Sequence, residues 1–173
     1  MGQGHALSVL ARAYHHSGGD NLYLNSASSG LRPFKVASSD GGVLANFLEH
    51  ILWYEEYRTQ PASFVLNDFI HAVLGLYDLS VVAPSASQEA TQLFRQGMVS
   101  LKQLLLLYDT GSGTTYDLRH FMLGTVPNMV RWDYHATHIN QLLLLATIDH
   151  DPLLTATAEQ LIDYMSGKTA AHN

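Results

Sequence analysis

Apolar residues recur every three or four positions over most of the chain, which is the spacing of one face of a helix. Glycines such as Gly18, Gly19 and Gly167 follow where these runs stop, as they commonly do after helix ends. The longest run follows Ser85 or Ser87, either of which suits an N-terminal cap. The spacing predicts helices at 3–16, 62–79, 134–147 and 152–166, and a long helix from Ser85 or Ser87 to the break at DTGSG, residues 109–113. A weaker helical pattern includes Leu22, Leu24 and Ala27.

The segment 34–48 breaks the helical pattern. Short apolar runs flank Asp40, Gly41 and Gly42 there, and such a triplet is typical of a tight turn. We therefore predict an all-α protein with a short β-hairpin-like insertion near residues 34–48. Helical hairpins alternating with polar loops favour an α/α toroid or an incomplete α/α barrel, by analogy between folds.

The composition bounds the domain organisation. A chain of 173 residues can bury a core of its own, so we expect residues 1–173 to form a single domain. Only 14% of the residues are charged while 47% are hydrophobic, which indicates that much of the side-chain surface is covered by neighbours or by a further segment. We therefore expect the chain to be a fragment of a longer, multi-domain protein.

Charge and cysteine content exclude several function classes. The net charge is −6, and nine basic residues are too few for a generic nucleic-acid binder, which needs clustered lysine and arginine. The chain has no cysteine, so it can form neither a disulfide framework nor a thiolate metal site. Its apolar runs are far shorter than the roughly 20 residues that cross a bilayer.

Two segments, 53–68 and 116–140, are polar, aromatic and without helical periodicity. In the second, Tyr116 and Tyr134 are each set among an acidic residue, an arginine and a histidine, which packing alone rarely requires. Arg119 follows Tyr116 by three residues and could bind a carboxylate of a ligand or pair with Asp117 or Asp133. These residues are the first candidates for a functional site.

The first segment contains the sequence WYEEY at 53–57. Glu55 and Glu56 lie between aromatic residues, and an aromatic surrounding would raise the pKa of a carboxyl group by desolvation, as a general acid or base requires. The alternative is a solvated acidic turn without a function.

Motifs for metal or cofactor binding are weak. His135 and His138 are three residues apart, but no third ligand stands at a diagnostic spacing, so we expect no metal. The DTGSG sequence lacks the lysine of a phosphate-binding loop, so we expect no cofactor. Aromatic residues with nearby arginines suit acidic sugars. The residues alone thus leave acidic-polysaccharide binding and proton-transfer chemistry both open.

The motifs at these positions resemble one known family. WYEEY at 53–57, PASFVLN at 61–67, GLYDL at 75–79, LYDTGSGTTYDLRHFMLG at 107–124 and RWDYH at 131–135 closely resemble the C-terminal domain of D-glucuronyl C5-epimerases. The resemblance covers nearly the whole chain. It implies an α/α-barrel-like catalytic domain that inverts C5 of glucuronate to iduronate in N-sulfated heparosan, during heparan sulfate and heparin biosynthesis.

The resemblance also implies site residues. The family's acid/base groups fall on Glu56, Tyr57, Tyr116 and Tyr134, and our hypothesis places Glu56 and Tyr134 on opposite faces of the sugar ring. Residues that match positions holding substrate are Asn67, His71, Arg119, Asn128, Arg131, Trp132, Asp133, His135 and Thr137. His71 stands where the family usually has an aromatic hydroxyl.

The expected setting follows from the same resemblance. Family members act in the Golgi lumen, form homodimers, and carry upstream β-rich domains and an N-terminal membrane anchor, none of which is in this sequence. Two alternatives stay open at this point. One is a uronic-acid polysaccharide lyase, which also abstracts the C5 proton, and the other is a non-catalytic domain that binds heparan-type polysaccharide.

Overall fold

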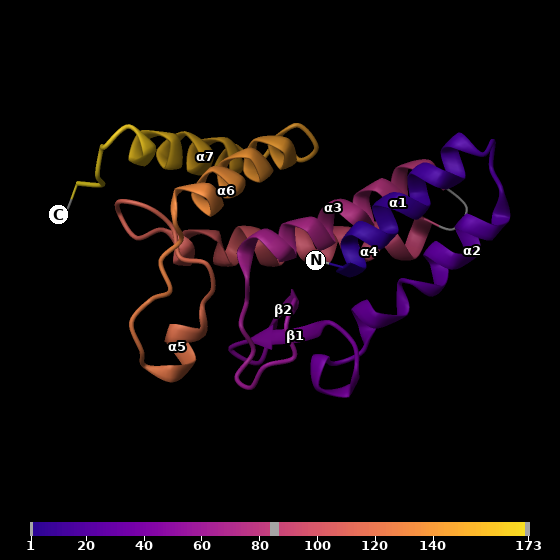
Figure 1. The fold of residues 1–173 in the computed structure, drawn as a ribbon, viewed down its shortest axis with the longest axis horizontal. Helices are drawn as coiled ribbons and strands as arrows, with labels where there is room; N and C mark the ends of the chain where they lie inside the picture. Colours follow the sequence, from indigo (N-terminus) through magenta and orange to yellow (C-terminus); the bar gives the residue numbers. More distant parts are fainter. Residues whose placement is uncertain (1, 84–86, 172–173) are drawn as a thin grey trace. The chain divides into compact units, whose positions relative to one another are not determined.

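The computed structural model describes residues 2–83 and 87–171. The chain divides into two compact units, Met1–Phe64 with Asp68–Ser100, and Val65–Asn67 with Leu101–Asn173. Figure 1 shows the helices and the β-hairpin of these units. The described residues are mostly helical, so the predicted all-α class with a β-hairpin is confirmed. Assembly of the helical hairpins into a toroid stays a prediction, as does the single domain.

The first unit contains two helices that pack as a hairpin, α1 (Gly2–His16) and α2 (Asn21–Ser29). Both confirm the helical spacing of the sequence. Asp20 caps α2, because its carboxylate accepts a hydrogen bond of 2.8 Å from the backbone N–H of Leu22. The unit also holds most of α3 (Leu66–Val82) and of α4 (Ser87–Leu104). Ser85, one of the two predicted caps of α4, lies outside the described residues.

Glycines let α1 and α3 approach each other closely. A Cβ atom added to Gly4 would collide with the backbone of His71 and Ala72, and one added to Gly75 would collide with the carbonyl group of Gly4. The two helices therefore meet backbone to backbone at this point, where only a residue without a side chain fits. This contact fixes the part of α3 that carries His71.

Aromatic rings fill the core of the first unit. Trp53 stacks on Phe69 with ring centroids 3.7 Å apart, and Tyr54 meets Phe34 edge to face at 4.9 Å. The Tyr54 hydroxyl donates a buried hydrogen bond of 2.8 Å to the carbonyl oxygen of Leu93. These rings pack inside the unit, so the WYEEY segment is anchored by its two leading aromatic residues.

The hairpin lies further along the chain than predicted. Strands β1 (Leu44–Phe47) and β2 (Ile51–Tyr54) pair antiparallel, with Phe47 opposite Ile51. The turn between them uses Leu48 and Glu49 at φ values of 48° and 68°. Non-glycine residues seldom adopt such angles, so the sequence did not indicate a turn there. Gly41, at φ 98°, instead ends a 3-10 turn at Ser38–Asp40 (η2).

Helix α3 begins at Leu66, four residues later than predicted. The cause is the buried carboxylate of Glu55, which accepts hydrogen bonds from the backbone N–H groups of Ser63 (3.2 Å) and Phe64 (2.8 Å). Phe64 also has a φ of 57°, which no helix allows. Pro61 therefore precedes an extended segment and is not part of the first helical turn.

The second unit begins with the end of α4 and the 3-10 turn η3 (Leu105–Tyr108), followed by α5 (Arg119–Leu123), α6 (Trp132–Ala146) and α7 (Pro152–Met165). Helices α6 and α7 pack together as a second helical hairpin, as the sequence predicted. The short helix α5 was not predicted. None of the helices in the described ranges is both long and apolar enough to cross a membrane.

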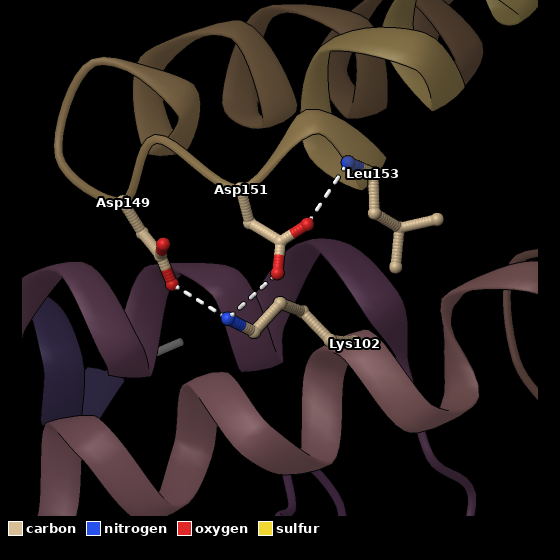
Figure 2. A network of polar contacts seen from close by, with 4 residues as sticks. All are labelled: Lys102, Asp149, Asp151 and Leu153. Atoms are coloured by element: carbon tan, nitrogen blue, oxygen red, sulfur yellow. Dashed lines mark hydrogen bonds and ion pairs between the residues drawn. The ribbon is translucent and has the colours of Figure 1, made fainter.

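A lysine ties α4 to the turn between α6 and α7 (Figure 2). Lys102 lies between the carboxylates of Asp149 (2.9 Å) and Asp151 (3.1 Å). The hydrogen bond to Asp149, supported by that to Asp151, raises the pKa of Lys102 above its usual value. Asp151 also caps α7 through the N–H of Leu153 at 3.0 Å, as expected for the Asp-Pro start of that helix.

Candidate functional site

The two tyrosine clusters of the sequence come together in the second unit. The backbone N–H of Tyr116 donates to the backbone carbonyl oxygen of Asn128 at 2.7 Å. The backbone N–H of Val130 likewise donates to the backbone carbonyl oxygen of Thr114 at 3.0 Å. This pairing brings Tyr116 to the start of α6, where Tyr134 lies in the first turn. Their rings meet edge to face with centroids 5.3 Å apart. Tyr134 remains 37% exposed, so its ring is accessible to a ligand.

Asp117 has a structural part in this arrangement. Its buried carboxylate accepts a hydrogen bond of 3.0 Å from the backbone N–H of Arg119 and one of 2.9 Å from the side-chain amide of Asn128. It thereby starts α5 and holds the two segments of the cluster together. The Asn128 amide is already engaged in this bond, although the residue itself is exposed.

Arg119 forms no ion pair with either predicted partner among the described residues. Its Nε atom is buried and has no hydrogen-bond partner in the described part of the chain. A buried donor without a partner is costly, and guanidinium groups bind carboxylates through parallel hydrogen bonds. Arg119 is therefore the cation in this unit best prepared for an anionic ligand.

The residues at the start of α6 differ in their exposure and in their internal partners. Trp132 is 77% exposed, and Arg131 is also exposed and lies 3.9 Å from the carboxylate of Asp133. Thr137 donates its hydroxyl hydrogen to the carbonyl oxygen of Asp133 at 3.0 Å, within the helix. Arg131 and Trp132 are thus free to meet a ligand, while Thr137 already has an internal partner.

His135 and His138 share one partner inside the unit. The hydroxyl group of Thr114 lies 3.1 Å from Nδ1 of His135 and 3.0 Å from Nδ1 of His138. The Nε2 atom of His135 lies 2.9 Å from the carbonyl oxygen of Leu161 and must carry a hydrogen, because a carbonyl group only accepts. Burial, followed by the proximity of His135, lowers the pKa of His138 to about 3.

With both imidazoles neutral, these contacts allow one arrangement of their hydrogens. A neutral His135 that donates through Nε2 must accept the Thr114 hydrogen at Nδ1. His138 then donates its own Nδ1 hydrogen to the Thr114 oxygen and remains neutral. Both side chains are buried, and their contacts with Thr114 and with the carbonyl oxygen of Leu161 anchor α6. Their geometry fits a support of the site, and His135 has no ring nitrogen left for a substrate.

We predict that Thr114→Val destabilises the protein by roughly 2 to 4 kcal/mol, because both Nδ1 atoms lose their buried partner. Urea unfolding followed by circular dichroism measures this difference. Thr114→Ser keeps the hydroxyl group and is the matched control, with a much smaller expected loss. Equal stability of the two variants would contradict the proposed network.

Asn67 belongs to the second unit and is buried at the start of α3. The backbone carbonyl oxygen of Asn67 accepts a hydrogen bond of 2.9 Å from the side-chain amide of Gln141 on α6. The backbone N–H of the neighbouring Leu66 donates to the carbonyl oxygen of Tyr116 at 3.2 Å. Asn67 therefore contributes to holding Tyr116 and α6 in place.

In the first unit, the surroundings of Glu56 alter the acidity of its carboxyl group. Its side chain is partly buried and is hydrogen-bonded to the side chain of Asp68, which is only 1% exposed. Burial, followed by the bond to Asp68 and the negative charge of that residue, raises the pKa of Glu56 to about 7. The expected rise in pKa is thus found at Glu56, while the carboxylate of Glu55 binds the backbone N–H groups of Ser63 and Phe64.

Tyr57 and His71 lie in the same unit as Glu56. Tyr57 is exposed, and its hydrogen bond with Glu56 acts against the rise in the pKa of that group. His71 meets His5 edge to face with ring centroids 4.5 Å apart. Burial, followed by the proximity of His5, lowers the pKa of His71 while Asp68 opposes this change. These side chains form a second group of titratable residues.

The sequence did not identify two residues that contact the candidate site residues, Asp68 and Thr114. Asp68 is twelve residues from Glu56, and Thr114 is more than twenty residues from both histidines. No local spacing connects residues so far apart. Over the described ranges, no group of three or more histidine, aspartate or glutamate side chains is arranged to hold a metal ion.

The described residues thus define a mostly helical protein in which phenol, carboxyl and guanidinium groups are available for proton transfer and for an anionic ligand. Comparison with known proteins gives the family. The family described as D-glucuronyl C5-epimerase C-terminus matches residues 1–163. The chain belongs to this family.

Two relatives are similar in sequence. A D-glucuronyl C5-epimerase of Caenorhabditis elegans is 52% identical over 183 aligned residues, which cover 100% of this chain and 29% of that protein. An uncharacterized protein of Methanocaldococcus jannaschii is 32% identical over 147 residues, 83% of this chain and 44% of that protein. The chain therefore spans less than half the length of either relative.

Proposed function

We propose that this chain is part of a uronate C5-epimerase, an isomerase that converts D-glucuronate to L-iduronate residues within N-sulfated heparosan. Two findings support this activity, the membership of the chain in the family and its 52% sequence identity to the D-glucuronyl C5-epimerase of Caenorhabditis elegans. In this proposal the protein acts in heparan sulfate and heparin biosynthesis in the Golgi lumen, as a homodimer.

The reaction requires two proton carriers. One group takes the proton from C5, next to the carboxylate, and the electron pair of the broken C–H bond moves into an enolate. A proton then returns to C5 from the opposite face, so the sugar is neither oxidised nor reduced. Because this balance needs no further reactant, we propose that no cofactor and no metal takes part. Donors placed at the carboxylate would stabilise the enolate.

The observation that carries the proposal is the contact between Tyr116 and Tyr134. Tyr134 is the proposed proton carrier, because its side chain is accessible and stands at the start of a rigid helix. Tyr116 positions that ring and relays protons to it. Arg119 is proposed to bind the uronate carboxylate, since its buried Nε atom lacks a partner in the described part of the chain.

Glu56 is the proposed second carrier. With a pKa of about 7, it can both accept and release a proton under neutral conditions, which is the property that general acid/base catalysis requires. Its pairing with Tyr134 on one sugar ring remains the prediction from the resemblance, because the two residues belong to different units. Tyr57 is proposed to assist Glu56.

The remaining candidates are proposed to contact the substrate or to support those that do. Arg131 and Trp132 are exposed and suited to direct contact. Residues whose side chain or backbone already has a partner inside the protein are better suited to support the substrate-contacting residues. This second set comprises Asn67, His71, Asn128, Asp133, His135 and Thr137.

The activity is tested by incubating the purified chain with N-sulfated heparosan in deuterium oxide. We expect deuterium to enter C5 and iduronate to form, both followed by NMR. A lyase would instead release unsaturated uronate, which absorbs in the ultraviolet. Binding of the polysaccharide without deuterium at C5 would show a non-catalytic domain and would contradict the proposal.

A further inference from the structure

The first unit contains an open surface pocket of about 780 Å³ that none of the predicted site residues lines. Its walls come from three segments, 37–39, 44–46 and 58–62. The last of these directly follows Glu56 and Tyr57 in the chain. The pocket and these two residues belong to the same unit.

The lining of this pocket is polar and carries a single type of charge. Hydroxyl groups come from Ser38, Ser39 and Thr59, side-chain amides come from Asn46 and Gln60, and the charged lining residue is Arg58. Alanine, leucine and proline side chains supply the remaining surface. Hydroxyl and amide groups combined with apolar side chains suit the polar and apolar surfaces of a sugar ring.

Arg58 is held in place at the edge of the pocket. Its guanidinium group donates one hydrogen bond of 3.0 Å to the carbonyl oxygen of Gly41, which has a left-handed φ of 98°. A guanidinium group has five N–H donors, so most remain for a ligand. The side chain is exposed, and its position is partly fixed before any ligand arrives.

We propose that this pocket binds an acidic sugar residue that flanks the reacting uronate in the same polysaccharide chain. The anionic group of that sugar, a carboxylate or an N-sulfate, is bound by Arg58, and its ring contacts the hydroxyl and amide groups of the pocket. The identity of the polysaccharide rests on the proposed function. The anionic and sugar-like nature of the ligand rests on the pocket itself.

One acidic residue acts against such a ligand. Asp40 is exposed beside the pocket, and its carboxylate accepts a hydrogen bond of 3.1 Å from the hydroxyl group of Ser39. Its negative charge repels an anion that approaches Arg58. Removal of this charge should therefore strengthen binding, which a merely unfolded variant could never do.

Binding of defined N-sulfated heparosan oligosaccharides is measured by calorimetry at low salt. Arg58→Gln is expected to weaken binding roughly fivefold to tenfold, as expected for the loss of a charge-assisted hydrogen bond at an exposed site. Asp40→Asn is expected to strengthen binding about twofold, by loss of a screened repulsion. Arg95→Gln, on α4 of the same unit, removes an exposed arginine outside the pocket and should leave binding unchanged.

Oligosaccharides with N-acetyl in place of N-sulfate identify the anion. A smaller effect of Arg58→Gln on the N-acetyl series assigns the bound group to the sulfate, and an equal effect assigns it to a carboxylate. Equal binding by Arg58→Gln, Arg95→Gln and the parent would overturn the inference. Because binding is measured without turnover, a chain that binds through Arg58 but exchanges no C5 proton would contradict only the proposed activity.

Discussion

Replacing Tyr134 with phenylalanine is expected to lower deuterium entry at C5 by at least about 100-fold, the usual contribution of a general acid or base. The substitution removes the phenol O–H and keeps the ring. Edge-to-face packing against Tyr116 does not need the hydroxyl group, so the fold should be retained. The rate is measured by NMR in deuterium oxide with saturating N-sulfated heparosan.

The control for this experiment is Tyr23→Phe, which removes a hydroxyl group from a half-buried tyrosine on α2 in the other unit. It should exchange C5 protons at the rate of the parent. Both variants should bind the polysaccharide within about twofold of the parent and melt within about 2 °C of it, as for other substitutions that leave packing intact. Full exchange by Tyr134→Phe would refute the proposed role.

Replacing Asp68 with asparagine is expected to move the pH profile of C5 exchange. The bond to Asp68 and the negative charge of that residue contribute, after burial, to the pKa of about 7 at Glu56. Without that charge the pKa of Glu56 falls, by roughly one unit or more. The limb of the profile that depends on Glu56 should move to lower pH by this amount, whether Glu56 acts as base or as acid.

Two further variants make the assignment specific. Asp78→Asn removes the same charge from the same helix, at a carboxylate 3.6 Å from Arg12, and should leave the profile in place. Glu56→Gln should abolish the limb altogether. His71 also titrates in this unit. If His71 rather than Glu56 caused this limb of the pH profile, the limb would persist in Glu56→Gln.

The same pair predicts a change in heat stability that does not depend on activity. A carboxyl group whose pKa is raised by folding favours the folded state below its unfolded pKa and loses this contribution as pH rises through its folded pKa. For Glu56 this window extends from its ordinary value of 4.5 to about 7. Relative to the parent, Asp68→Asn should therefore gain melting temperature as pH rises through that window.

Helix positions could be read from the sequence because they depend on local spacing. α1, α6 and α7 were all predicted to within two or three residues from apolar residues on one face, and Asp151 marked the start of α7. The beginning of α3 could not be read in this way. It depends on the carboxylate of Glu55, eight and nine residues before the N–H groups that it binds.

The candidate site was also partly predictable, because some of its residues lie close together in the sequence. The density of tyrosine, arginine and acidic residues within 114–140 singled out that segment, but spacing could not say that Asp117 would bind Asn128 while Arg119 lacks an ion pair in the described part of the chain. Nor could it show that Glu55 is buried against backbone N–H groups while Glu56 is hydrogen-bonded to Asp68.

By itself, the sequence determined the helical class, the approximate helix positions, the family and the segments that hold the candidate residues. These follow from local periodicity and from long motifs. Only the tertiary structure decided that Tyr116 meets Tyr134, that Thr114 serves two histidines and that Asp68 is bonded to Glu56. Such contacts join residues twelve or more positions apart, and their energies depend on burial, which no local pattern records.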